Sequence, residues 1–294
     1  MNKYLDIFLQ SFSGYWNYLL SEILNPSWHN YFYWLIALSV VVWLLELIVP
    51  WRKSQSFIRK DFWMDAFYMF FNFFLFSLVL YNGVSNVAVN LFHDLLAGLG
   101  ITNIVAIEIS SWPVWVQLLF VFVIADFIQW NIHRMLHRNK KLWEFHKVHH
   151  SVKEMGFAAH LRFHWMETVV YKSILYIPLS MIGFGIDDFF IVHIISVAIG
   201  HLNHANIGWD YGPFKYVFNN PKMHIWHHAK VLPKNHSHGM NFGISLSVWD
   251  YLFKTAYIPS NGKNIELGFP GDNEFPATFG QQVIYPLNKT NENT

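Results

Sequence analysis

Long apolar runs dominate the first two hundred residues of the chain, and few charges interrupt them. The runs at 31–49, 62–81 and 113–130 are each close to the roughly 20 residues that a helix needs to cross a hydrocarbon core. Each run therefore predicts a membrane-spanning helix. A fourth apolar region, 168–200, is divided near its middle by glycines and acids at 183–188. This pattern predicts a helical hairpin, formed either by two steep spans or by a deep re-entrant pair.

The segments around these runs divide the chain into three parts. Residues 1–30 are mixed and aromatic, which favours an amphipathic helix at the membrane interface, and residues 82–112 are expected to form a loop. Residues 201–260 are polar and rich in histidine, and the last thirty are expected to be weakly ordered. The predicted parts are an N-terminal membrane segment at 1–110, a histidine-rich domain at 111–260 and a tail at 261–294.

The composition favours a membrane protein and excludes several other classes. The chain is 53% hydrophobic and 13% charged, whereas ordinary soluble domains are about 25% charged. A net charge of +1 argues against a nucleic-acid partner, and the absence of cysteine excludes disulfides, thiolate-held metal sites and cysteine nucleophiles. The first thirty residues lack the pattern of a cleavable signal peptide, so we expect insertion through the chain's own spans.

The distribution of basic residues predicts an orientation in the membrane. Lysine and arginine are frequent at 51–60 and at 132–167, but they are absent from 82–112. Because short cytoplasmic loops carry the excess of basic residues, the first two segments are expected on the cytoplasmic side. The hairpin then returns the chain to that side. The predicted fold is thus an all-α, polytopic membrane helix bundle with a helical cap on its cytoplasmic face.

Four clusters of histidines carry the candidate chemistry of this cap. Their members are His133 and His137; His146, His149 and His150; His201 and His204; and His224, His227 and His228. Spacings of three and four residues place side chains on one face of a helix, and neutral imidazole is the commonest metal ligand in proteins. Ten such ligands exceed the four to six that one ion accepts, so we predict a site for two metal ions. Iron in such a site could activate O2, although the residues alone leave zinc and manganese open.

Other polar residues near the clusters are candidates for supporting roles. Asp126 lies seven residues before His133, two helical turns away, and is predicted to accept a hydrogen bond from the outer N–H of a ligand histidine. Glu144 and Glu167 could act in the same way or be solvated. His164 and His193 are predicted to support the site without binding metal. Further histidines are not needed as ligands: His160, His236 and His238.

The clusters, taken with a C-terminal motif, resemble the fatty acid hydroxylase superfamily. The motif comprises Asn241-Phe-Gly243 and the run from Trp249-Asp250 to Thr255, and the resemblance extends over about 115–256. Lys254 stands where the family usually has glycine, a departure that we expect to be structural. The resemblance implies a non-haem centre of two iron ions at the cytoplasmic face, with O2 as co-substrate and a membrane lipid as substrate.

The predicted function is therefore O2-dependent hydroxylation or desaturation of a sterol or an acyl chain. The chain has no Gly-x-Ser-x-Gly elbow and no glycine-rich dinucleotide fingerprint. We expect electrons to come from a separate ferredoxin, cytochrome b5-like protein or pterin. Two alternatives stay open: a membrane protein that binds or transports metal without oxidase activity, and a structural relic that keeps the fold without turnover.

Overall fold

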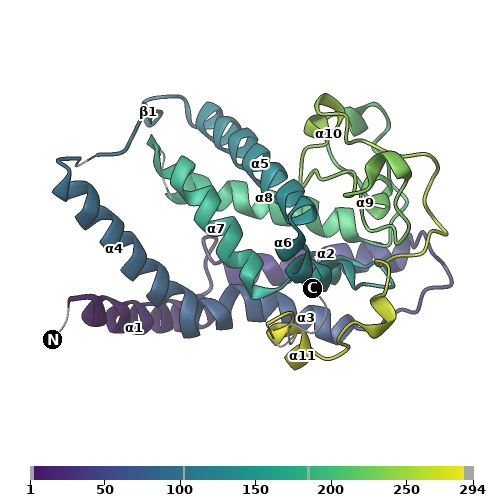
Figure 1. Cartoon of the computed structure of the whole chain (residues 1–294), viewed down its shortest axis with the longest axis horizontal. Coiled ribbons are helices and arrows are strands. Elements are labelled where there is room, and N and C mark those ends of the chain that lie inside the picture. Colours follow the sequence, from purple (N-terminus) through teal and green to yellow (C-terminus); the bar gives the residue numbers. More distant parts are fainter. Residues whose placement is uncertain (1–2, 102, 184–185, 288–294) are drawn as a thin grey trace.

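The computed structural model describes residues 3–101, 103–183 and 186–287 and shows an all-α chain (Figure 1). Two-residue strands β1 (Ile107–Glu108) and β2 (Ile182–Gly183) pair in parallel and attach the segment before α5 to the tip of the α7–α8 hairpin. The α-helices are α1 (Lys3–Leu24), α2 (Tyr31–Ile48), α3 (Phe62–Phe70), α4 (Asn82–Gly98), α5 (Val114–Arg138), α6 (Lys140–His150), α7 (Trp165–Ser180), α8 (Ile186–His204), α9 (Pro221–His227), α10 (Val248–Leu252) and α11 (Phe279–Ile284).

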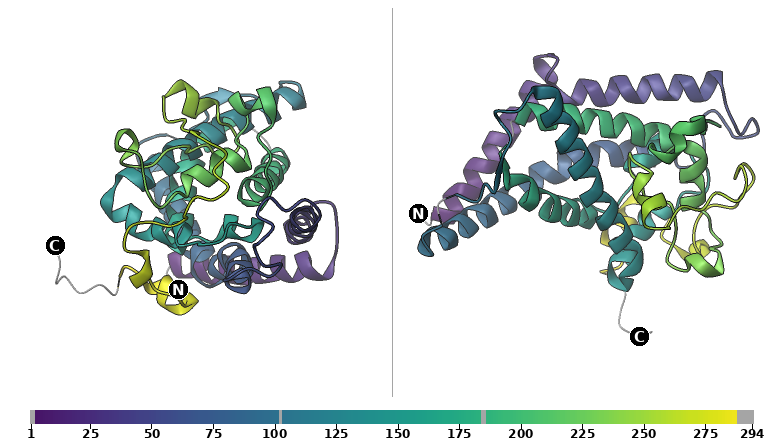
Figure 2. Two further views of the ribbon diagram at one scale, coloured as in Figure 1. Left: turned by 90° about the vertical axis from the view of Figure 1, so that its right-hand side faces the viewer. Right: turned by 90° about the horizontal axis from the view of Figure 1, so that it is seen from above.

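Two of these helices are long and apolar enough to cross a membrane. They are α2 and α5, which coincide with the first and third predicted spans. The predicted hairpin is also helical, with α7 and α8 as its arms, and α8 runs alongside α2 (Figure 2). Shorter apolar helices occupy Phe62–Leu75 and Phe189–His204. The apolar pattern therefore located these helices, although the second predicted span, 62–81, is not among the helices long enough to cross a membrane.

The prediction of a loop over 82–112 is wrong for its first part. The apolar run from Phe62 continues through two π-helical segments, Phe71–Leu75 and Ser77–Tyr81, directly into α4. Helix α4 packs against α1 at one end of the molecule (Figure 1). Its asparagines contribute to this contact, since Asn82 and Asn86 donate side-chain hydrogen bonds to the backbone and hydroxyl oxygens of Ser11. Polar residues that suggested a loop thus hold two helices together.

The C-terminal tail is more ordered than the sequence suggested. Helix α11 has a capping box formed by Thr278 and Gln281, and Phe279 packs edge-on against the rings of Phe67 and Tyr68. The carbonyl of Val283 accepts hydrogen bonds from the ring nitrogens of His164 and Trp165. The tail therefore packs beside the start of α7. The composition of the tail favours turns, but the ring of Phe279 and the capping box of α11 are sufficient to order this segment.

A buried ionic network joins α3 to the segment between α6 and α7. The carboxylate of Asp65 pairs with the guanidinium groups of Arg59 and Arg162, and all three side chains are at most 4% exposed. Arg162 also donates a 2.8 Å hydrogen bond to the hydroxyl of Ser151. The backbone carbonyl of Arg162 lies 3.1 Å from Nδ1 of His149. The network thus fixes one of the predicted metal ligands.

Replacing Asp65 should destabilise the protein strongly. The Asp65→Ala variant leaves the buried Arg59 without its carboxylate and leaves Arg162 only its longer pair with Asp61, and breaking a buried pair in this way costs about 3–5 kcal/mol. We expect a large fall in the thermal unfolding midpoint in detergent. Asp94→Ala is the matched control, because it breaks an exposed pair with Lys3 and should leave the midpoint unchanged. Equal midpoints for the two variants would contradict this account.

Candidate metal centre

The first five predicted ligands come from two helices joined by a sharp bend. Helix α5 ends at Arg138 and α6 begins at Lys140. Asn139, between them, adopts an extended conformation, and its side-chain oxygen accepts hydrogen bonds from the N–H groups of Lys141 and Leu142. This N-cap satisfies the first turn of α6. The bend brings the HxxxH face of α5 and the HxxHH face of α6 toward the same point.

The remaining predicted ligands come from α8 and α9. Helix α9 is short, and it begins with Asn220 as N-cap and Pro221 at its first position, an arrangement that favours helix initiation. It carries His224 and His227, and His228 follows as its C-cap. His204 is the last residue of α8, which packs against α9. Four helices thus converge at the end of the molecule opposite to α1 and α4.

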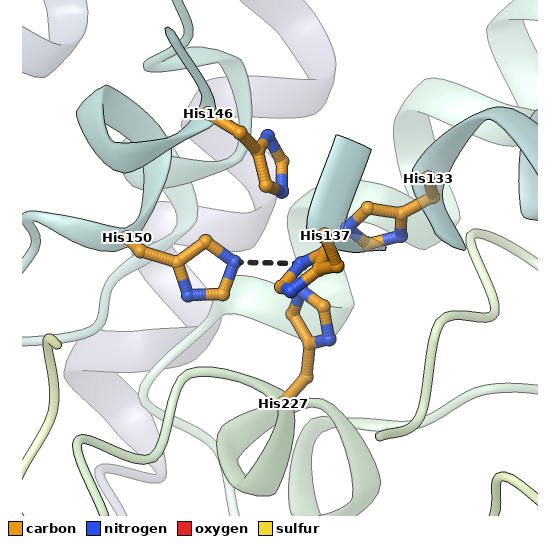
Figure 3. A group of neighbouring side chains, drawn as sticks. All are labelled: His133, His137, His146, His150 and His227. Carbon is orange, nitrogen blue, oxygen red and sulfur yellow. Dashed lines mark hydrogen bonds between the residues drawn. The ribbon is translucent and has the colours of Figure 1, made fainter. Parts of the chain in front are cut away.

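Nine of the ten predicted histidines form two adjacent groups. Within each group one ring nitrogen of every residue lies within 4.8 Å of the others, and no side chain in either group is more than 9% exposed. The rings of His150 and His228, from different groups, have centroids 4.5 Å apart. The first group comprises His133, His137, His146, His150 and His227 (Figure 3). The second comprises His149, His204, His224 and His228.

The outer nitrogens of five of these rings are fixed by acceptors. Nδ1 lies 2.7–3.1 Å from an oxygen in each case, and because a backbone carbonyl can only accept, Nδ1 carries the proton in the four rings that face carbonyls. A neutral ring that is protonated at Nδ1 presents a lone pair at Nε2. The pairs are His133 with Phe242, His146 with Glu167, His149 with Arg162, His204 with Gly200, and His227 with Met240.

The inward nitrogens are arranged as ligands of cations. Nε2 of His149 and Nε2 of His204 lie 3.3 Å apart, and since both rings donate through Nδ1, two lone pairs face each other. Such a contact is repulsive unless a cation lies between the nitrogens. In the other group, Nε2 of His146 and of His227 are buried without a hydrogen-bond partner. Buried polar atoms rarely lack partners, so both groups fit metal ions.

Burial keeps these rings neutral. It lowers the pKa of His149 to about 3, and burial together with neighbouring imidazoles lowers the pKa of His150, His224 and His228 well below the usual value. Metal binding requires deprotonated nitrogen, and a ring that is already neutral loses no proton when it binds. The site is therefore prepared for metal at physiological pH by its exclusion of water.

The predicted role of Asp126 is wrong in its partner. Its carboxylate accepts hydrogen bonds from the N–H groups of Ser245 and Leu246 and from Nε1 of Trp249, rather than from a ligand ring. Asp126 and His133 both lie on α5, but the acceptor positions of the Asp126 carboxylate are occupied by donors from the segment after α9. Glu167, one of the alternatives, makes the contact instead, with its carboxylate 2.7 Å from Nδ1 of His146.

A second carboxylate, Asp250, has a structural role that the sequence reasoning missed. It accepts hydrogen bonds from the N–H groups of Phe242 and Gly243, and also from Nε1 of Trp130 and the hydroxyl of Thr255. This clamp positions the carbonyl of Phe242, which accepts from His133. The only indication of this role in the sequence was the motif formed by Asn241-Phe-Gly243 and Trp249-Asp250.

The same clamp explains Lys254, the departure from the expected glycine. Its φ is +58°, in the left-handed region that glycine adopts without strain. Lys254 lies in the tight turn that follows α10. The N–H of Thr255, the next residue, donates a hydrogen bond to the carbonyl of Asp250. The lysine keeps the turn at a conformational cost.

The other predicted residues lie outside the two groups. His201 belongs to neither, because its ring points from α8 toward α2, with Nε2 3.2 Å from Ser39 and Nδ1 2.9 Å from Nδ1 of His160. His164 caps α7 by accepting from the N–H of Met166. His193 packs against the ring of Tyr31, with centroids 5.1 Å apart. These three side chains therefore contribute to packing and capping around the centre.

A cavity of about 1270 Å³ opens beside the histidines. Its inner end is lined by members of both groups, among them His133, His146, His149 and His204. From there it extends between α7 and α8 to the aromatic residues of α1 and α4, including Tyr15 and Phe92. The cavity is large enough for a long apolar molecule that extends from α1 and α4 to the histidines.

The sequence of this region matches a known domain. Residues 118–255 match the fatty acid hydroxylase family model and include all nine grouped histidines. This part of the chain is therefore similar to the fatty acid hydroxylase domain. The two histidine groups therefore lie within the matched range, and the helices α1 to α4 lie outside it. No solved structure matches the chain.

Curated relatives of this domain share a part of their length with the chain. Ornithine lipid hydroxylase OlsE of Rhizobium tropici is 31% identical over 61% of the chain and 53% of its own length. Alkylglycerol monooxygenase of Homo sapiens is 27% identical over 46% of the chain and 29% of its own length. Very-long-chain aldehyde decarbonylase GL1-10 of Oryza sativa is 25% identical over 47% and 46%. The chain thus spans about half, or less, of the length of these relatives.

Removal of the Glu167 carboxylate should weaken metal binding. Partners of this kind orient a ligand ring, and their loss costs about 10–100-fold in metal affinity. We expect Glu167→Ala to lose Fe(II) to a competing chelator at a correspondingly lower chelator concentration. Glu167→Gln should lose less, since its amide oxygen can still accept from His146. Glu266→Ala removes an exposed carboxylate and serves as control. Equal retention by Glu167→Ala and Glu266→Ala would show that Glu167 has no such role.

Proposed function

We propose that the protein is a membrane-bound oxidoreductase that uses two iron ions and O2 to hydroxylate or desaturate a lipid. The observation that carries the proposal is the position of nine neutral histidines, in two groups, at the inner end of a lipid-sized cavity. The fatty acid hydroxylase domain and its relatives, an ornithine lipid hydroxylase and an alkylglycerol monooxygenase, support oxidation of a lipid.

The donor sets suit two redox-active ions. The groups supply five and four imidazoles, whereas an octahedral ion accepts six ligands, so open positions remain at both. Iron bound there would supply the reduction of O2 and the removal of hydrogen from a C–H bond. The transfer of one oxygen atom to the lipid leaves the other as water and needs two electrons and two protons. A separate ferredoxin, cytochrome b5-like protein or pterin supplies these electrons.

The chain's own residues determine which bond reaches the centre. Phe163, Val197 and other apolar side chains line the cavity and hold the lipid chain away from water. The carbonyls of Phe242 and Met240 and the carboxylate of Glu167 hold the rings in fixed orientations. Because the ligand rings are fixed, a lipid bound in the cavity can meet the metal site without a costly rearrangement.

The membrane arrangement follows from the two apolar helices and the basic segments. We place α2 and α5 across the bilayer in a multi-pass arrangement, with the histidine groups at the cytoplasmic face, as the excess of lysine and arginine at 51–60 and 132–167 indicates. The substrate then enters laterally from the bilayer, and a soluble electron donor reaches the centre from the cytoplasm.

The purified protein should contain two iron ions per chain, and each histidine group should be needed for its own ion. His227→Ala and His149→Ala remove a ligand from the first and second group, and each should lower the iron content and abolish lipid oxidation. His93→Ala, an exposed histidine on α4, is the matched control and should change neither. Elemental analysis of protein in neutral detergent checks this result. Fewer than one transition metal per chain in intact wild-type protein would overturn the dinuclear proposal.

Lipid analysis of a strain that lacks the gene would identify the substrate. We expect one lipid to accumulate and a product that carries an additional hydroxyl group or double bond to disappear. Restoring wild-type protein should reverse both changes, and restoring His149→Ala should reverse neither. An unchanged lipid profile, with altered cellular metal content, would instead support a metal-transport function.

A further inference from the structure

The cavity beside the histidines contains a single basic side chain that the oxidation chemistry does not use. Among the described residues that line it, Lys172 of α7 is the one lysine or arginine, and Glu167 is the one acid. Glu167 is already engaged with His146 and with the N–H of His164. Apart from the metal site, the charge that the cavity offers to a ligand is therefore positive and comes from Lys172.

Lys172 has no carboxylate to balance its charge. No acid within the described ranges pairs with it, and its ammonium group instead lies 4.3 Å from the centroid of the Tyr81 ring. A contact of this kind orients a cation but leaves most of its charge unmatched. An ammonium group in an apolar cavity is costly unless it is paired. An anionic group of a ligand would stabilise the ammonium group of Lys172 in this position.

Nearby hydrogen-bond donors also lack partners. The hydroxyls of Tyr31 and Thr168 line the same cavity, and both are buried without a hydrogen bond in the structure. The imidazole of His193 packs against Tyr31 and lies within electrostatic reach of Lys172. Buried hydroxyls are normally bonded, so these groups are also suited to a polar ligand. Ammonium, imidazole and hydroxyl groups together favour an oxyanion.

We infer that the cavity binds a lipid with an anionic headgroup, a carboxylate or a phosphate, and that Lys172 pairs with that group. This inference rests on the proposed lipid oxidation and specifies its substrate class. Lys172 follows Glu167 by five residues, which corresponds to about 7.5 Å along α7. Since Glu167 touches His146, the anion lies on the order of 10 Å from the metal site. The oxidised carbon is therefore separated from the headgroup by the length of chain that spans this distance.

Binding of matched single-chain lipids tests the inference without turnover. The probes are radiolabelled palmitate and the neutral hexadecanol, added to iron-loaded protein in neutral detergent. Charge-assisted hydrogen bonds contribute about 1.5–3 kcal/mol, so wild-type protein should prefer palmitate by at least about tenfold. Lys172→Met should lose this preference, and Lys172→Arg should keep it. The exposed Lys140→Met is the matched control and should behave like wild type.

Three further measurements make the outcome decisive. Iron content and the unfolding midpoint of Lys172→Met should equal those of wild type, and Lys172→Arg reports on the site if the methionine variant does not fold. Equal affinity of wild-type protein for palmitate and hexadecanol, or an unchanged preference in Lys172→Met, would overturn the inference. Competition by inorganic phosphate at the concentration of palmitate would overturn the lipid assignment in favour of a free anion. Failure of the di-iron proposal would appear separately, as a protein that takes up no iron during loading and still prefers palmitate.

Discussion

The structure depends on the convergence of imidazole lone pairs in a space without water. Nε2 of His149 and of His204 face each other at 3.3 Å, and neither can donate because each ring gives its proton to a carbonyl on the outer side. Each group is therefore unfavourable by itself and favourable around a cation. The hydrogen bonds at Nδ1 create this condition, since they fix both the tautomer and the direction of each ring. Under the proposed function, folding and metal binding are consequently coupled at this end of the molecule.

The acceptors that bind the outer nitrogens of the histidine rings come from distant parts of the chain. The histidine groups therefore hold these segments together. Glu167 belongs to α7, the carbonyl of Arg162 to the segment before it, and the carbonyls of Met240 and Phe242 to the loop after α9. Apart from one 3-10 helical turn at Lys234–His236, that loop has no helix or strand of its own. It is held instead by two buried carboxylates, Asp126 and Asp250, that accept its backbone N–H groups. An irregular segment is thereby made rigid enough to position ligand rings.

The sequence predicted many of the helices and the grouping of the histidines, because both depend on local, periodic patterns. Apolar runs located α2 and α5, and spacings of three and four residues identified all nine grouped histidines. The failures concern contacts between segments distant along the chain. His201 and His204 are three residues apart, yet one ring turns toward α2 and the other toward α9. Which partner Asp126 finds likewise depends on how the loop after α9 returns, which no local pattern encodes. Order in the tail depends on the rings of α3 against Phe279.

The cavity is bordered both by the histidine groups and by the helices that surround them. Its inner end is defined by the histidine groups, whereas its polar side, with Lys172 and Tyr31, is formed by α7 and α2. Helix α7 contributes to both, because Glu167 near its start orients His146 and Lys172 five residues later faces the cavity. One rigid helix therefore sets the distance between the metal site and an anionic headgroup. In the proposed reaction, selection of the oxidised carbon follows from that fixed distance rather than from recognition of the apolar chain, whose methylene groups are chemically alike.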